Sequence, residues 1–308
     1  MTRYILQRLG YMIITMFLIA TFTFFLMKFL PGTPLSAADK LSEEQQAVVL
    51  EKYGLDDPVP VQYFNYIVNL TQGDLGISFQ FDNREVTTII MERIGPSMTI
   101  GVQAMIVGTI LGMLLGLVSA IYHNGFLDYG STFIAVLGKS IPSFVFAGIL
   151  QYYVGVKLGW FPVALWGTWQ HTVMPTIALA IFPLAIAARF MRTEMLEVLG
   201  SDYITTARAK GVNKFGVVFK HGLRNALIPL VTVLGPLAIG LVTGTLVIEN
   251  IFAVPGIGEQ FVKAINTNDF PIIMGTTLLI AFLFIFIILV IDLLYGVIDP
   301  RIRLAEGE

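Results

Sequence analysis

The residues best suited to binding a partner lie in one polar stretch, 201–229, between two apolar blocks of the sequence. Ser201 or Asp202 can cap the start of a short helix there, and Gly211 can end it in the left-handed conformation. The helix would carry small and basic side chains, namely Tyr203, Thr205, Thr206, Ala207, Arg208, Ala209 and Lys210. Small side chains let a partner approach closely and charges orient it, so the stretch predicts a docking helix. A solvated connector helix would have the same end signals, and this alternative stays open.

Ionisable residues inside apolar blocks are the second group that could carry function, because charge is costly in lipid. Lys139 is one of them, and it is followed by Ser140, Pro142 and Ser143. Either these four residues line a water-filled pathway, or Lys139 reaches the membrane interface or a neighbouring subunit. Asp128 lies near the end of a block, from which its carboxylate can reach the interface. A proton- or sodium-coupled carrier usually needs a carboxylate at mid-depth, and the blocks contain none.

The sequence lacks the signatures of common enzymes. It has no zinc-protease His-Glu-x-x-His, no Gly-x-Ser-x-Gly elbow and no phosphate-binding loop. His123, His171 and His221 fall in different loops, and the chain has no cysteine. We therefore expect no catalytic residues, no metal and no cofactor in this chain. If the chain takes part in uphill transport, the energy must come from another polypeptide.

The composition is that of a membrane protein. Hydrophobic residues make up 56% of the 308-residue chain and charged residues only 13%, far from a soluble globular domain. The formal net charge of −2 argues against nucleic acid as a partner. A bilayer span takes about 20 apolar residues. Six blocks meet this length: Leu9–Leu30, Ser97–Ile121, Tyr129–Val156, Thr172–Ala188, Ala226–Ile248 and Pro271–Ile291.

The basic residues of the short loops predict the orientation of these spans. Eleven Lys and Arg residues fall in the N-terminus, the loop after the fourth block and the C-terminus. The short loops of the opposite group contain only Lys157 and Lys263. We therefore expect both termini and the stretch 201–229 to be cytoplasmic.

The segment 31–96 is polar and acidic and would lie outside the membrane. Ser42–Gln45 reads as a capping box, and Gly54 is placed where that helix should stop. A second, amphipathic helix is predicted over Pro60–Leu70, ended by Thr71–Asp74. We expect a small helical cap, which is either purely structural or a surface for an external partner.

Glycines at four-residue spacing occur in two of the predicted spans. Gly108, Gly112 and Gly116 form one ladder, and Gly240 and Gly244 repeat the spacing in the fifth span. Glycine lets helix backbones approach in lipid, so both ladders predict helix packing, within the chain or against a second membrane subunit.

The polar stretch carries a recognisable pattern. Thr205-Thr206-Ala207, then three residues, then Gly211 occupy the spacing of Glu-Ala-Ala-x-x-x-Gly, the signature of ATP-binding-cassette (ABC) importer permeases. Threonines stand in place of the Glu and the first Ala, and His221–Pro229 replaces the usual ending. Both departures resemble the peptide/nickel branch of the family. The missing Glu leaves open which side chain contacts the ATPase.

The resemblance extends over almost the whole chain, to the B-type permease subunits of oligopeptide importers. It rests on the combination of several short motifs, each weak alone. They are Arg3–Arg8, Tyr53–Pro58, Val61–Tyr63, Gly73–Ser78, Ser140–Phe144, Ile248–Gly258 and Ile298–Arg303.

The resemblance implies an all-α polytopic protein of the bacterial cell membrane with six transmembrane helices and the fold of a type I ABC importer permease. Residues 1–30 would form the cytoplasmic N-terminus and first span, and 31–96 the outer cap. Residues 97–297 would form the five-helix core, with a coupling helix at about 201–211 that docks on an ATPase. Residues 298–308 would form the cytoplasmic tail.

The resemblance also implies a permease subunit that forms half of the translocation pathway of an ATP-driven oligopeptide importer. The implied partners are a second related permease, two cytoplasmic ATP-binding subunits that hold ATP and Mg, and an external peptide-binding protein. Lipid would surround the chain, and nucleic acid is not expected. Uptake of a dipeptide, nickel or glutathione is the nearest alternative. An ATP-independent channel or secondary carrier is a more distant one, as is a membrane enzyme or scaffold.

A turn is predicted after the fifth span, because Pro255, Gly256 and Gly258 interrupt any helix. The resemblance suggests that this segment, with Glu249 and Phe252, lies near an outer gate and the docked binding protein.

Overall fold

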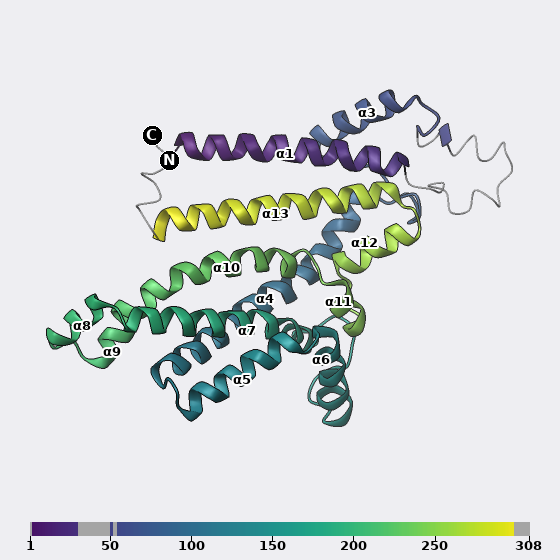
Figure 1. The fold of residues 1–308 in the computed structure, drawn as a ribbon. Coiled ribbons are helices and arrows are strands. Elements are labelled where there is room, and N and C mark those ends of the chain that lie inside the picture. Colours follow the sequence, from purple (N-terminus) through teal and green to yellow (C-terminus); the bar gives the residue numbers. More distant parts are fainter. Residues whose placement is uncertain (1, 30–49, 52–53, 299–308) are drawn as a thin grey trace. The chain divides into compact units, whose positions relative to one another are not determined.

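The computed structural model describes residues 2–29, 50–51 and 54–298. This part of the chain is almost entirely helical (Figure 1), which confirms the predicted all-α class. The chain divides into two compact units. The first comprises Met1–Gly95 and Gly256–Ile285, and the second comprises Pro96–Pro255 and Phe286–Glu308.

The first unit gathers the N-terminal helix and the segments expected outside the membrane. Its apolar core includes Val86, Ile90, Ile257 and Ile273, with Met27 packed against it. Its elements are α1 (Thr2–Phe29), α3 (Val59–Thr71), the start of α4 (Val86–Ile121), α12 (Ile257–Asn266) and the first part of α13 (Phe270–Ile298).

The helix predicted over Pro60–Leu70 is present as α3. The break after it is confirmed, because Gly73 adopts a φ of +79° that only glycine accepts easily. Gly54 also has a positive φ, +61°, consistent with a helix stop. The predicted capping box at Ser42–Gln45 lies outside the described residues.

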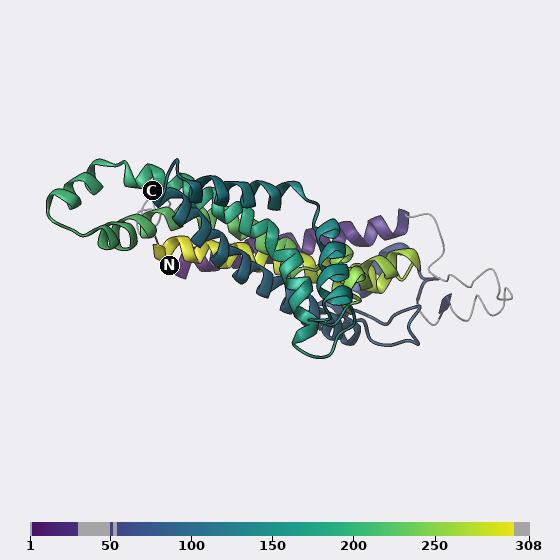
Figure 2. The same ribbon diagram turned by 90° about the horizontal axis from the view of Figure 1, so that it is seen from below.

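The second unit is built around α7 (Gln170–Leu199), which packs against α5, α6 and α10. Figures 1 and 2 show α8 and α9 at one end of α7 and α10, with α6 and α11 toward the other end. The other elements are α5 (Phe126–Ser140), α6 (Ser143–Leu150), the π-helix η2 (Gln151–Lys157), α8 (Asp202–Ala209), α9 (Lys214–Gly216), the π-helix η3 (Val217–Leu223), α10 (Arg224–Val242) and α11 (Leu246–Phe252).

Described helices overlap each of the six predicted spans. Four are long, apolar helices: Leu6–Phe29, Val86–Ile121, Gln170–Leu199 and Phe270–Ile291. The other two are bent pairs, Phe126–Ser140 with Ser143–Lys157 and Thr232–Val242 with Leu246–Phe252. The described residues thus include four helices able to cross a bilayer by length and composition, or six spans if each bent pair is one span.

The third predicted span, Tyr129–Val156, is not one continuous helix. The chain bends by 103° between α5 and α6. Ile141 has an extended backbone (φ −82°, ψ 121°) and Pro142 precedes the first residue of α6. A residue before proline is driven out of the helical region by the proline ring, which explains the break.

The first glycine ladder packs α4 directly on α7, as predicted. A Cβ atom added to Gly108, Gly112 or Gly116 would lie 2.4–2.5 Å from a backbone oxygen of α7. Those oxygens belong to Ala180, Leu184 and Ala188. Since no side chain can occupy such space, glycine is required for this close approach of two helices.

The second ladder does not make the same kind of contact within the described chain. Nothing among the described residues lies within 4 Å of a Cβ built on Gly240. Gly244 has a φ of +103° and lies between α10 and α11, where the pair bends by 50°. Gly244 therefore lies at the break in the span, and Gly240 packs against no helix of the described chain, which leaves packing against a second membrane subunit as a prediction.

Candidate functional site

The predicted helix at 201–211 is present as α8, and its end has the predicted form. Gly211 adopts a φ of +82°. Its N–H donates to the carbonyl of Arg208 (3.0 Å), and the N–H of Val212 donates to that of Ala207 (3.2 Å). These two bonds form a Schellman motif, which satisfies the last carbonyls of a helix.

The start of α8 differs in detail. Ser201 occupies the N-cap position with an extended backbone, but its side chain makes no capping bond. The hydroxyl donates instead to the carbonyl of Val198 in α7, at 2.6 Å. Ser201 thus fixes the corner between α7 and α8.

The two faces of α8 have different roles. Ile204 and Ala207 are buried, and the helix packs against η3. Of the predicted contact residues, Ala207 therefore belongs to the inner face. The others are exposed, namely Asp202, Tyr203, Thr205, Thr206, Arg208, Ala209, Lys210 and Gly211.

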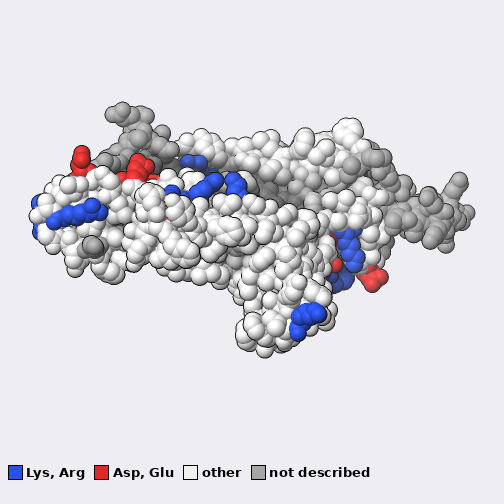
Figure 3. All heavy atoms as spheres, turned by 60° about the horizontal axis from the view of Figure 1, so that its bottom comes forward, with Lys and Arg blue, Asp and Glu red and all other residues white. Residues whose placement is uncertain are grey.

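The exposed face of α8 carries small and basic side chains, and two of its hydroxyl groups form hydrogen bonds within this chain. The hydroxyl of Thr206 donates to the carbonyl of Asp202 at 3.0 Å, so this donor is used within the helix. The Tyr203 hydroxyl accepts from the side-chain amide of Asn225 in α10 at 3.0 Å, which ties α8 to the next span. Figure 3 shows Lys and Arg side chains at the end that carries α8 and α9, with Asp and Glu nearby and a further group of Lys and Arg along the flank. The geometry suits contact with a soluble partner.

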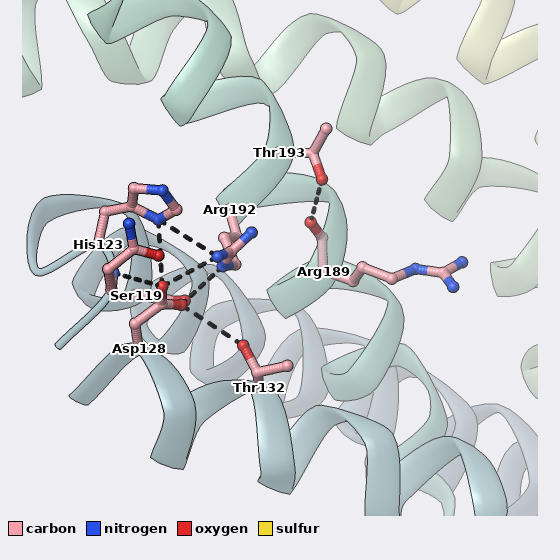
Figure 4. Close-up of polar contacts among 8 residues, drawn as sticks. Ser119, His123, Asp128, Thr132, Arg189, Arg192 and Thr193 are labelled. Carbon is pink, nitrogen blue, oxygen red and sulfur yellow. Dashed lines mark hydrogen bonds and ion pairs between the residues drawn. The ribbon is translucent and has the colours of Figure 1, made fainter. Parts of the chain in front are cut away.

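A buried ion pair fastens the same end of the unit (Figure 4). Asp128 at the start of α5 is 2% exposed. The Arg192 guanidinium of α7 donates to both of its carboxylate oxygens, from Nε at 2.7 Å and from Nη2 at 2.9 Å. Such bidentate pairs are geometrically specific as well as strong.

Further groups complete the coordination of the Asp128 carboxylate. The hydroxyl of Ser119 in α4 and the backbone N–H of Asn124 (2.9 Å) both donate to it. His123 Nδ1 lies 3.1 Å from Oδ2. The cluster therefore joins α4, α5 and α7. In the sequence, Asp128 is only a residue near the end of a span, because nothing local points to an arginine 64 positions away.

A groove of about 190 Å³ runs beside this cluster, between α4, α5 and α7. Of the predicted pathway residues, Lys139 and Ser140 line it, whereas Pro142 and Ser143 at the start of α6 do not. The residues that carry hydroxyl or charged groups in its wall are Ser119, Ser131, Thr132, Lys139, Ser140, Arg189, Arg192 and Thr193.

The turn predicted after the fifth span is present, and two of the residues named with it, Glu249 and Phe252, face inward. Glu249 is fully buried and accepts from the hydroxyl of Ser97 at 2.7 Å and from the N–H of Thr245 at 3.2 Å. Phe252 is 1% exposed and belongs to the apolar core of the second unit. Both side chains therefore lie in the interior of that unit.

The turn itself is made by the residues that follow. Ala253 adopts the left-handed conformation (φ 50°) after the last residue of α11. Pro255 is partly buried, and Gly256 precedes α12 as its N-cap with an extended backbone. Gly258 lies in the first turn of α12. Among the described residues, no group of three or more His, Asp or Glu side chains could hold a metal ion.

Two family models together match nearly the whole sequence. Residues 108–304 match the binding-protein-dependent transport system inner membrane component, and residues 1–101 match the N-terminal part of such membrane components. The chain belongs to this family. It is therefore a multi-pass inner-membrane permease, and the resemblance to ABC importer permeases is confirmed.

Curated relatives cover the full length of the chain. The dipeptide transport system permease protein DppB of Lactococcus lactis subsp. cremoris is 49% identical over 304 residues, 99% of this chain and 100% of that protein. The oligopeptide transport system permease protein OppB of Haemophilus influenzae is 38% identical over 305 residues, 98% of this chain and 100% of the relative. The peptide branch predicted from Thr205, Thr206 and His221–Pro229 is thereby confirmed.

A solved structure shares the fold. The MetNI methionine ABC transporter in an inward-facing conformation aligns with a TM-score of 0.56 over 69% of this chain and 97% of that chain. The sequence identity is 18%, so the likeness concerns the architecture of the helices alone.

Proposed function

We propose that this permease imports short peptides and forms half of their translocation pathway. The observation that carries the proposal is full-length similarity to permeases named for dipeptide, oligopeptide and glutathione transport. These names share one chemical class, a short peptide. The chain is 49% and 43% identical to two dipeptide permeases and 38% identical to an oligopeptide permease. Dipeptides are therefore a candidate substrate beside oligopeptides.

The proposed machine contains partners that supply energy and substrate. A second related permease completes the pathway, and two cytoplasmic subunits bind ATP and Mg and hydrolyse the nucleotide. An external protein delivers the peptide, in line with the binding-protein dependence in the family description. The permease itself carries no catalytic residue in this proposal.

The exposed face of α8 is the proposed contact with an ATP-binding subunit. Thr205 and Thr206 offer a small surface that fits a cleft, and Arg208 and Lys210 orient it. Since Ser201 and Tyr203 bind α8 to α7 and α10, a displacement of α8 moves both spans. Alternating access follows when these spans change position around the pathway. In this arrangement both termini and α8 are cytoplasmic, as the basic residues of the short loops indicate.

The test is purification of the tagged chain from its native membrane, followed by uptake in vesicles. We expect a second permease and two ATP-binding subunits to copurify, and labelled di- or oligopeptides to accumulate only with ATP and the external protein. Peptide transport by the isolated chain without ATP would contradict the proposal. Comparing peptides of two to five residues in the same assay separates the two substrate candidates.

A further inference from the structure

We propose that the groove between α5 and α7 binds the C-terminal carboxylate of the peptide during transport, with Lys139 and Arg189 as its cationic ligands. This inference rests on the proposed function and assigns a site to it.

The groove has the size and position for a small polar group. Its volume of about 190 Å³ lies between helices of a single compact unit. Lys139 is at the last turn of α5, about three helical turns from Asp128. Arg189 is one turn before Arg192 on α7. The two cations therefore line the same groove, Lys139 from α5 and Arg189 from α7.

The charges of the groove do not cancel. Asp128 is the acidic group beside it, and Arg192 already binds both oxygens of that carboxylate, at 2.7 and 2.9 Å. Figure 4 shows that the guanidinium of Arg189 extends away from the cluster. Within the part of the chain that the structure describes, neither Lys139 nor Arg189 forms an ion pair with a carboxylate. The wall thus has a surplus of positive charge.

The hydroxyls of Ser140 and Thr193 donate to carbonyls of their own helices, which leaves the two cations as the main groups that can recognise a ligand. Ser140 donates its hydroxyl to the carbonyl of Val136 at 2.8 Å, and Thr193 donates to the carbonyl of Arg189 at 3.1 Å. The charged donors that remain for a ligand are the ammonium of Lys139 and the guanidinium of Arg189, which bind oxyanions. A carboxylate fits this site, whereas the N-terminal ammonium of a peptide would be repelled.

Charged side chains within a membrane span are costly, so Lys139 and Arg189 are expected to have a function. Unpaired Lys and Arg within spans are tolerated when they face water or a partner anion. Every unmodified peptide ends in a carboxylate whatever its side chains are. A permease that binds this group transiently can therefore act on peptides of varied sequence.

The test measures ATP-driven uptake by the assembled complex in vesicles, with a peptide of neutral side chains and with its C-terminal amide. The variants are Lys139→Gln and Arg189→Gln, with Lys139→Arg as a charge-preserving variant. Each rate is divided by the wild-type rate for the same peptide, so that selection by the external binding protein cancels. Lys157→Gln is the matched control, because this exposed lysine on η2 lies outside the groove.

We expect either Gln variant to lower uptake of the free-carboxylate peptide about tenfold, the effect of losing one hydrogen bond to a charged group. Uptake of the amide should change little, Lys139→Arg should lose less than Lys139→Gln because it keeps the charge, and Lys157→Gln should keep the wild-type rates. Equal losses for both peptides, dependent on the anionic lipid content of the vesicles, would overturn the inference and assign the groove to lipid phosphate. Unchanged rates in both Gln variants would also overturn it. If the wild-type complex imported neither peptide, the proposed function itself would fail.

Discussion

Asp128 is a buried carboxylate whose oxygens are shared by groups from α4, α5 and α7. A buried ion pair need not add much net stability, because both charges lose water. Removing one partner is different, since the other charge is left without compensation. The pair is therefore better understood as a fixed connection between helices than as a source of stability.

Replacing Asp128 with Asn tests this connection. We expect Asp128→Asn to lower the free energy of unfolding by about 3 kcal/mol, the low end for a broken buried pair, since Arg192 is 29% exposed. Thermal unfolding of the purified permease in detergent measures the change. The control is Glu92→Gln, which breaks the exposed pair with Arg84 and should cost less than about 1 kcal/mol. Equal effects of the two substitutions would contradict a special role for Asp128.

Packing between elements depends on the absence of side chains. Along the contact of α4 and α7, carbonyl oxygens lie too close to the glycines of α4 to leave room for a Cβ atom. In α8, by contrast, side chains make the packing contact: Ile204 and Ala207 fill the inner face, and small residues cover the outer one.

Gly112→Ala should separate α4 from α7. The new Cβ would lie 2.4 Å from the carbonyl oxygen of Leu184, so the helices must shift, at a cost of about 1–3 kcal/mol. The matched control is Gly240→Ala in α10, where nothing described lies within 4 Å. Alanine favours helix by about 1 kcal/mol there, so the control should be neutral or stabilising. Unfolding in detergent distinguishes the two, and a neutral Gly112→Ala would refute the close contact.

Thr206→Trp should interfere with docking while leaving the fold intact. Thr206 is exposed on the outer face of α8, so added volume meets a partner rather than this chain. We expect about tenfold weaker retention of the ATP-binding subunits during purification. Asn65→Trp, on the exposed face of α3, is the control for a bulky residue on a short helix. Wild-type retention and coupled ATP hydrolysis in Thr206→Trp would exclude this face as the contact.

At the scale of the whole molecule, the proposed orientation puts the two ends of α7 on opposite sides of the membrane. This helix has 30 residues, which is long enough at 1.5 Å per residue to cross about 30 Å of hydrocarbon. α8 follows one end of the helix, and the loop with Thr168 precedes the other.

Single-cysteine labelling tests this orientation directly, because the natural chain has no cysteine. We expect Lys210→Cys to react with a membrane-impermeant maleimide only in inside-out vesicles, and Thr168→Cys only in right-side-out vesicles. Both residues are exposed, so burial does not limit either reaction. Labelling of both from the same side would refute the predicted topology.

Local chemistry let the sequence by itself determine much of this protein. Apolar blocks predicted the spans because a segment that crosses lipid must be long and mostly apolar. Gly211 and Gly73 predicted helix ends because only glycine adopts positive φ easily. The signature at Thr205–Gly211 and the motifs around it predicted the family. Lys139 and Ser140 were recognised as pathway candidates from their position in a span.

Only the tertiary structure decided which distant residues meet. The pairing of Asp128 with Arg192 and the shared groove of Lys139 and Arg189 depend on the packing of α5 against α7. The burial of Ala207 depends in the same way on contacts outside its own segment. Sequence patterns report the preferences of a residue and its near neighbours, whereas these contacts follow from how helices far apart in the chain fit together.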